Sequence, residues 1–277
     1  MEYKTLRDGA RIPMLGLGTY KAGGGEGERV VARAAELGYR LFDTAAMYGN
    51  EDAVGRGIRA SGIKREDFFV VTKLSHKSYG RAEAAVAESL DRLGLGYIDL
   101  MLLHWPFGDY YAAWRVLESF KKKGVIKSIG VSNFDPARLI DLINYNELPP
   151  SVDQIETHLL CRRSAERKWM DKYGVAHMGY APLGHGVKNS MLMLPEVRRA
   201  AAKYGVTEAQ IALRCQVQSG VIVIPKTVRE ERLRENLDIF GFEIDKDDME
   251  SLAKLDKNEP FIGTPDAPEK AEAALLW

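Results

Sequence analysis

The chain has little cysteine, no excess of either charge and no long apolar run. Its 277 residues include two cysteines, Cys161 and Cys215, which are too few for a disulfide framework and lack the spacing of a metal site. Lysine plus arginine equals aspartate plus glutamate at 39 each, so no overall field favours nucleic acid or an anionic membrane. No signal segment and no stretch of membrane-spanning length occurs. We expect a cytoplasmic protein with no nucleic-acid, membrane or obligate protein partner.

Several motifs of common enzyme classes are also missing. The sequence contains no HExxH, no clustered carboxylates, no GxSxG elbow and no Walker sequence. The glycine run at residues 23–27 lacks the GxGxxG spacing of a dinucleotide loop, and we interpret it as a flexible loop. The sequence therefore predicts no metal site and no nucleophile of the usual type.

Short apolar runs alternate with amphipathic stretches along the chain. Eight runs fit buried strands, at residues 15–19, 40–44, 69–74, 98–104, 128–132, 152–157, 177–182 and 221–225. The stretches with helical spacing are 28–37, 51–61, 81–93, 111–122, 136–144, 165–173, 195–218 and 229–239. No change of composition marks a domain boundary. The pattern predicts one α/β domain over residues 1–277, a (β/α)8 TIM barrel, with an open doubly wound sheet as the alternative.

The first residues have a different pattern. Residues 3–17 read as a β-hairpin, with Asp8 and Gly9 supplying the turn. In a barrel this hairpin would close the N-terminal end. The chemistry would then lie at the opposite end, where strands end and loops begin.

Reactive side chains follow neighbouring predicted strands. Asp43, Lys73 and His104 stand at three consecutive strand ends, and Tyr48 follows Asp43 by five positions. A lysine ammonium near the phenol would lower its pKa, Asp43 would hold the lysine, and His104 would orient a substrate oxygen. Each residue alone could be a cap, a packed ring, a strand-end lysine or a core histidine. Together they favour an acid–base site suited to carbonyl reduction by a hydride-donating cofactor.

A candidate anion site lies late in the chain. The predicted strand 221–225 leads into Lys226 and Thr227, and Arg232 and Asn236 stand on the early turns of the next helix. Backbone N–H groups at that helix start, together with the two cations, would bind a phosphate. Barrels commonly bind phosphate after strands seven and eight. The alternative is a surface helix with solvated charges.

The chain resembles the aldo-keto reductases along nearly its whole length. The resemblance rests on LGLGTY at 15–20, GYRLFDTAAMYGNE at 38–51, VTKL at 71–74, IDLMLLHWP at 98–106, IGVSNF at 129–134, DQIE at 153–156, GYAPLG at 179–184, and IPKTV with RxxEN at 224–236. It implies an oxidoreductase that reduces small-molecule aldehydes and ketones with Tyr48, Asp43, Lys73 and His104 as its catalytic residues. Because Lys226 and Arg232 are both present, the implied cofactor is NADP, with NADPH preferred and NADH possible.

The same resemblance implies the cofactor and substrate contacts. Ser132, Asn133 and Gln154 would bind the nicotinamide carboxamide, and Tyr180 would stack on the ring. The full implied cofactor set is Gly18, Thr19, Asp43, Ser132, Asn133, Gln154, Tyr180, Pro182, Leu183, Lys226, Thr227, Val228, Arg232, Glu235 and Asn236. The implied substrate contacts are Tyr20, Tyr48, His104 and Trp105, with Trp277 as a further aromatic.

Two short segments bear on the substrate pocket. The loop after Trp105 and the tail after Asp256 are both short, so we expect an open and permissive pocket. Two other functions remain open from the sequence. One is a nicotinamide-binding regulatory subunit of the same superfamily, and the other is a barrel isomerase or aldolase without a redox cofactor.

Overall fold

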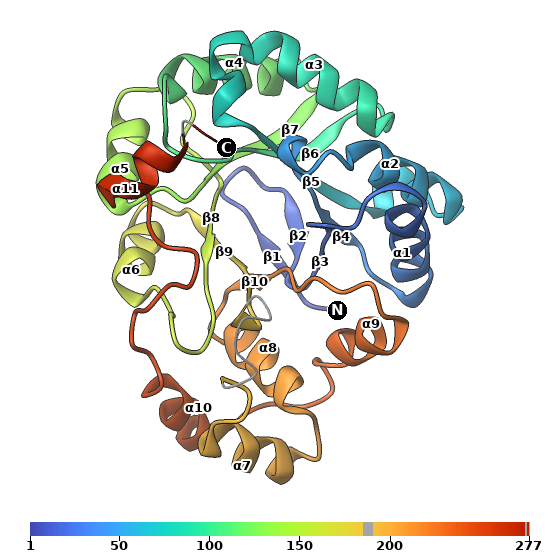
Figure 1. Cartoon of the computed structure of the whole chain (residues 1–277), viewed down its shortest axis with the longest axis vertical. Coiled ribbons are helices and arrows are strands. Elements are labelled where there is room, and N and C mark those ends of the chain that lie inside the picture. Colours follow the sequence, from blue (N-terminus) through green and yellow to red (C-terminus); the bar gives the residue numbers. More distant parts are fainter. Residues whose placement is uncertain (185–190, 275, 277) are drawn as a thin grey trace.

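The computed structural model describes residues 1–184, 191–274 and 276, and it is built around eight parallel strands ringed by helices (Figure 1). Each strand pairs in parallel with the next one along the chain. The strands are β3(Leu17–Gly18), β4(Leu41–Asp43), β5(Phe69–Leu74), β6(Ile98–Leu103), β7(Ile126–Ser132), β8(Val152–Glu156), β9(Ala176–Tyr180) and β10(Ile222–Val223). The strands are almost wholly buried, as apolar strands covered by helices must be.

The first and last strands of the sheet meet and close it. Parallel bridges join Leu15 to Val223 and Gly18 to Lys226. The N–H of Gly16 donates to Val223 O at 2.9 Å, and the N–H of Val223 donates to Met14 O at 2.9 Å. The expected eight-stranded barrel is therefore confirmed. β10 ends at Val223, two residues before the predicted end of that strand.

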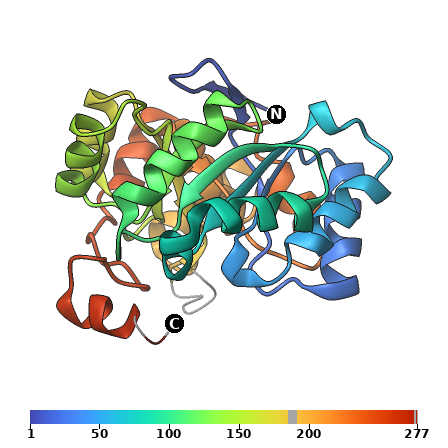
Figure 2. The same ribbon diagram turned by 90° about the horizontal axis from the view of Figure 1, so that it is seen from above.

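The N-terminal hairpin is also confirmed. β1(Tyr3–Thr5) and β2(Arg11–Pro13) pair antiparallel, and Gly9 in the turn adopts a φ of +87°, which favours glycine. Leu6 is buried in the main core. Figure 2 shows the hairpin and the C-terminal segment at opposite ends of the barrel.

Helices cover the outside of the barrel (Figure 1). They are α1(Gly24–Leu37), α2(Glu51–Ala60), α3(Ala82–Leu93), α4(Tyr110–Lys122), α5(Pro136–Asn144), α6(Ser164–Lys172), α7(Pro195–Tyr204), α8(Glu208–Gln218), α9(Glu230–Leu237), α10(Lys246–Ala253) and α11(Pro268–Ala274), with short 3-10 helices η1(Ala46–Tyr48), η2(Arg65–Asp67) and η3(His76–Arg81). The predicted helical region 195–218 is two helices, because Gly205 ends α7 with a φ of +66°. The sequence analysis did not predict α10 or α11. No helix in the described part of the chain is long and apolar enough to cross a membrane.

The glycine run at 23–27 is not the flexible loop that we expected. Helix α1 begins at Gly24, and the N–H of Gly27 donates to Gly23 O at 3.1 Å. A Cβ at Gly27 would lie 2.4 Å from Ala22 O and 3.5 Å from the Cβ of Ala53 on α2. The small residues therefore let the start of α1 pack closely on α2.

Candidate active site

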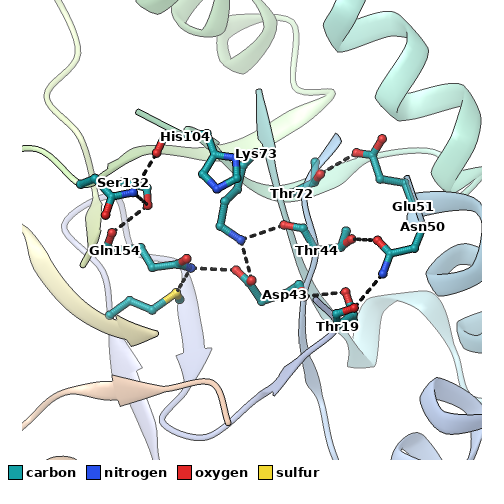
Figure 3. A network of polar contacts seen from close by, with 12 residues as sticks. Thr19, Asp43, Thr44, Asn50, Glu51, Thr72, Lys73, His104, Ser132 and Gln154 are labelled. Carbon is teal, nitrogen blue, oxygen red and sulfur yellow. Dashed lines mark hydrogen bonds and ion pairs between the residues drawn. The ribbon is translucent and has the colours of Figure 1, made fainter. Parts of the chain in front are cut away.

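A buried ion pair lies at the centre of the site. Asp43 is the last residue of β4 and Lys73 lies on β5, and Nζ of Lys73 is 2.5 Å from Oδ1 of Asp43 (Figure 3). Nζ also donates to Thr44 O at 2.8 Å. Burial is the largest influence on both groups: it raises the pKa of Asp43 and lowers that of Lys73, while their mutual attraction opposes both shifts. The strands thus bring these two predicted residues together.

Tyr48 lies beside this pair on η1 rather than on a strand. The Lys73 Nζ atom is 5.2 Å from the centroid of the Tyr48 ring. The ring also stands edge-on to the His104 ring, with centroids 5.8 Å apart. The 3-10 helix that follows β4 therefore places the phenol ring close to the lysine of β5 and to the histidine that follows β6.

Our prediction that Lys73 lowers the pKa of Tyr48 is wrong. Burial raises the pKa of Tyr48 well above 10.0, and the charge of Asp43 raises it further. The Lys73 ammonium is bonded to the Asp43 carboxylate, so the pair offers the phenolate little net positive charge. The phenol therefore stays protonated at neutral pH.

His104 follows β6 by one residue and is buried. Burial, followed by the charges of Lys73 and His76, lowers the pKa of His104 well below 6.5. The imidazole is therefore neutral at physiological pH and carries one N–H donor. Within the described residues its Nδ1 atom has no hydrogen-bond partner.

Polar side chains from β7, β8 and β9 form the opposite wall. The Asn133 amide donates to His104 O at 3.0 Å, and its Oδ1 atom accepts from the Tyr180 hydroxyl at 2.8 Å. The Ser132 hydroxyl donates to Gln154 O at 2.8 Å. Nε2 of Gln154 donates to Oδ2 of Asp43 at 2.7 Å. This wall is thereby bonded directly to the central ion pair.

A second set of buried polar residues supports the site, and the sequence analysis assigned no role to them. The Asn50 amide donates to Thr19 O and Ala22 O at 2.8 Å each, and its oxygen accepts from the Thr44 hydroxyl at 2.6 Å. The Glu51 carboxylate accepts from the Thr72 hydroxyl at 2.5 Å. Both residues belong to the GNE end of the motif around Asp43, but only the fold shows that they tie β3, β4 and β5 together (Figure 3).

These side chains surround a cavity of about 580 Å³, a size within the usual range for ligand sites. Most of the predicted site residues line it: Gly18, Thr19, Tyr20, Asp43, Tyr48, His104, Trp105, Ser132, Asn133, Gln154, Tyr180, Pro182, Leu183 and Lys226. The wall also includes residues that we did not predict, namely Lys21, Met47, Ala181, Ile224, Pro225, Ile262 and Lys270.

The expectation of an open pocket was only partly right. Tyr20 and Tyr48 do line the cavity as an aromatic pair, with ring centroids 5.0 Å apart. The short tail, however, returns over the barrel and contributes Ile262 and Lys270 to the wall. Trp277, which we expected as a further aromatic, lies outside the described residues.

The remaining predicted cofactor residues lie beyond the cavity, in the turn after Lys226 and on helix α9. They are Thr227, Val228, Arg232, Glu235 and Asn236. Thr227 is buried, and its hydroxyl accepts from the Arg229 N–H at 3.1 Å. Lys226 and Arg232 are both exposed, and neither forms an ion pair with any residue that the structure describes. Both cations therefore face solvent, where an anion could reach them, and Lys226 also lines the cavity.

The described residues contain no group of three or more potential metal-ligating side chains.

The chemistry that the site can perform follows from the side chains of Tyr48, His104 and Lys73. A protonated phenol and a neutral imidazole face the same cavity, and a buried lysine stands behind the phenol. Such a set can give a proton to an oxygen that gains negative charge.

Comparison with known proteins gives consistent matches. A sequence profile of the Aldo/keto reductase family matches residues 14–257. A methylglyoxal reductase, DkgA, of Escherichia coli O157:H7 is 39% identical over 264 residues, which cover 94% of this chain and 96% of that protein. A 2,5-diketo-D-gluconic acid reductase B of Corynebacterium sp. (strain SHS752001) is 38% identical over 271 residues, covering 96% and 97%. The crystal structure of MGS-M4, an aldo-keto reductase from a Medee basin deep-sea metagenome library, superimposes with a TM-score of 0.93 at 35% identity, covering 95% and 98%.

Proposed function

The chain belongs to the aldo/keto reductase family, an oxidoreductase family that acts on carbonyl groups, and from this premise we propose that it reduces aldehydes and ketones with NADPH. One observation carries the proposal. Tyr48, Lys73 and His104 come from different parts of the chain, and they converge at one end of a cavity large enough for a nicotinamide and a small carbonyl compound.

Tyr48 is the proposed proton donor. Because burial keeps its pKa high, the phenol holds its proton at Oη until the substrate oxygen gains negative charge. When the proton leaves, the phenolate forms on the ring whose centroid lies 5.2 Å from Nζ of Lys73. Asp43 keeps Lys73 in position throughout.

His104 is the proposed orienting residue. Its lowered pKa keeps the imidazole neutral, so it donates a hydrogen bond to the carbonyl oxygen without competing as the acid. The Asn133 amide fixes the backbone of His104 by its bond to the carbonyl oxygen. The imidazole and phenol would thus hold the same substrate oxygen from two sides.

The wall residues fit a nicotinamide. The bound cofactor would supply the hydride to the carbonyl carbon. The Oε1 atom of Gln154 accepts no hydrogen bond from the described residues, so it remains available for a carboxamide N–H. A Cβ at Gly18 would lie 2.9 Å from Ile224 O, so the glycine lets the end of β3 approach the backbone after β10 closely at the cavity wall. We assign Ser132, Asn133, Gln154 and Tyr180 to the nicotinamide end.

Lys226 and Arg232 support NADPH over NADH. An adenosine 2′-phosphate needs cations that are accessible and not already paired, and both side chains meet this requirement among the described residues. Thr227, Val228, Glu235 and Asn236 lie beside them in the chain, where we assign them to the adenosine end.

The buried cysteines Cys161 and Cys215, which form no disulfide, suit the reducing cytoplasm that we propose as the location.

The test is a substrate screen. We expect NADPH consumption with methylglyoxal and with simple aromatic aldehydes, together with the corresponding alcohols as products. NADH should give a lower kcat/KM in the same assay. If no carbonyl compound in such a panel caused NADPH consumption, and NADPH did not bind, the proposal would be wrong and a barrel enzyme without a redox cofactor would be the better reading.

A further inference from the structure

A buried amide, that of Asn50, closes the loop that carries Tyr48. The hydroxyl of Thr44, directly after β4, donates to Oδ1 of Asn50 at 2.6 Å, and these two residues are six positions apart in the chain. Tyr48 lies between them on η1, and its N–H donates to Ala45 O at 2.9 Å. One side-chain bond therefore joins the two ends of the loop at residues 44–50 (Figure 3).

The same amide ties this loop to the connection between β3 and α1. Nδ2 of Asn50 donates to Thr19 O and to Ala22 O, at 2.8 Å each. Both N–H groups of the amide are thereby used, and its oxygen accepts from Thr44. Because Asn50 is almost fully buried, rotating the amide would leave these polar groups without partners. The hydrogen bonds therefore hold the side chain in one orientation.

The local sequence preference would use Asn50 differently. Asn50 is the N-cap residue of α2, and asparagine is favoured there because its side chain can accept from the first N–H groups of a helix. Among the residues that the structure describes, no such bond forms between the Asn50 side chain and α2. A local preference that the fold overrides is expected at functional positions. The side chain of Asn50 thus serves the loop instead of the helix.

The loop is also joined to the central ion pair through Thr44. Its carbonyl oxygen accepts from Nζ of Lys73 at 2.8 Å, and Oδ1 of Asp43 accepts from the same Nζ atom at 2.5 Å. The Thr44 N–H donates to Val71 O at 2.8 Å. Thr44 is therefore held at its N–H, its carbonyl oxygen and its hydroxyl. Of these three bonds, the hydroxyl bond is the one that connects it to Asn50.

We propose that Asn50 is a positioning residue for the proton donor. By joining the two ends of the loop, it sets where the Tyr48 phenol lies relative to Lys73 and His104. Asn50 is not among the described residues that line the cavity, so it acts through Tyr48. This inference rests on the proposed reductase function and deepens it. A catalytic group that is misplaced by about 1 Å loses much of its effect on rate, so a loosened loop should slow proton transfer.

The experiment removes the bond between Thr44 and Asn50 in two ways. Thr44→Val deletes the hydroxyl and nearly keeps the size of the side chain, whereas Asn50→Ala removes the whole amide. Thr44→Ser keeps the hydroxyl and tests for rescue. For each variant, the single-turnover rate of benzaldehyde reduction by bound NADPH and the dissociation constant of NADPH are measured. The same rates are then measured in the Tyr48→Phe background.

Thr157→Val is the matched control for the loss of a buried threonine hydroxyl. Thr157 is also almost fully buried, and its hydroxyl donates to Ile155 O at 3.0 Å. It is not among the described residues that line the cavity. Its variant should therefore keep the parent rate.

We expect the rate of the chemical step to fall about tenfold in Thr44→Val and further in Asn50→Ala. NADPH affinity should be nearly unchanged in Thr44→Val, and Thr44→Ser should keep most of the parent rate. In the Tyr48→Phe background both losses should disappear, because the proton donor that the loop positions is already absent. Thr44→Val decides the question alone if Asn50→Ala does not fold.

Two outcomes would overturn the inference alone. One is an equal fractional loss of rate in the parent and in the Tyr48→Phe background, because the bond would then act on the fold or on the cofactor and not on the phenol. The other is a parent rate in Thr44→Val. Failure of the parent protein itself to reduce aldehydes with NADPH would instead contradict the proposed function, and the inference would fall with it.

Discussion

The Nε2 atom of Gln154 donates a 2.7 Å hydrogen bond to Oδ2 of Asp43, and this bond crosses the interior of the barrel from β8 to β4. The same carboxylate binds Lys73 through its other oxygen. Gln154, which we assign to the nicotinamide, and the Asp43–Lys73 pair, which lies beside the proposed acid Tyr48, are therefore parts of one hydrogen-bonded unit (Figure 3). Cofactor binding and catalysis should be sensitive to the same few side chains.

The buried ion pair gives a prediction about stability. Replacing Lys73 by Met leaves the Asp43 carboxylate buried without its cation, so the free energy of unfolding should fall by about 3–5 kcal/mol. Denaturant titration measures this loss. As the control, Glu36→Gln breaks an exposed ion pair with Arg33 and should have a much smaller effect. A loss in Lys73→Met no larger than that in the control would show that the pair does not stabilise the fold.

The raised pKa of Tyr48 and the lowered pKa of His104 predict a broad pH profile for reduction. The proposed mechanism needs a protonated phenol, which is present below a pKa that lies above 10.0, and a neutral imidazole, which is present above a pKa that lies below 6.5. At saturating NADPH, kcat/KM for the carbonyl substrate should therefore be flat from about pH 6.5 to about pH 10. A change of kcat/KM with pH in the middle of this range that is absent in His104→Gln would contradict our inference that the imidazole is neutral there.

The two exposed cations predict a difference between cofactors. In Lys226→Gln and Arg232→Gln we expect NADPH affinity to fall by about tenfold or more, with a much smaller change for NADH. Fluorescence titration of each cofactor gives the dissociation constants. Arg234→Gln is the control, because Arg234 is on the same helix and is paired with Glu230 at 2.7 Å. Equal losses of affinity for NADPH and NADH would show that Lys226 and Arg232 do not bind the 2′-phosphate.

A buried carboxyl away from the cavity gives a prediction about pH and stability. Burial raises the pKa of Asp153 well above 3.8. Between the unfolded pKa and this raised folded pKa, the unfolded chain releases a proton that the folded chain keeps, so stability falls as pH rises. Asp153→Asn should be more stable than the parent, by a margin that grows by up to about 1.4 kcal/mol per pH unit over that window. A margin that did not change with pH would show that the carboxyl is already ionised in the folded protein.

The barrel and most of the cavity lining were predictable because strand ends are visible as local patterns. Asp43, Lys73 and His104 each follow an apolar run, and parallel strands bring such ends to one edge. The pKa direction of Tyr48 was not predictable, because it depends on burial and on how fully Asp43 neutralises Lys73. The position of Lys270 was not predictable either, since it depends on the contact of the tail with Glu156, 105 residues from Phe261.

The most direct test of the account is single-turnover reduction of an aldehyde by Tyr48→Phe with NADPH already bound. The phenylalanine keeps the ring and removes only the hydroxyl, so the dissociation constant for NADPH should be nearly unchanged. The rate of the chemical step should fall by about 10²–10⁴-fold, because the proton donor is lost. A variant that binds NADPH and reduces the aldehyde at the parent rate would contradict the assignment of Tyr48 as the acid.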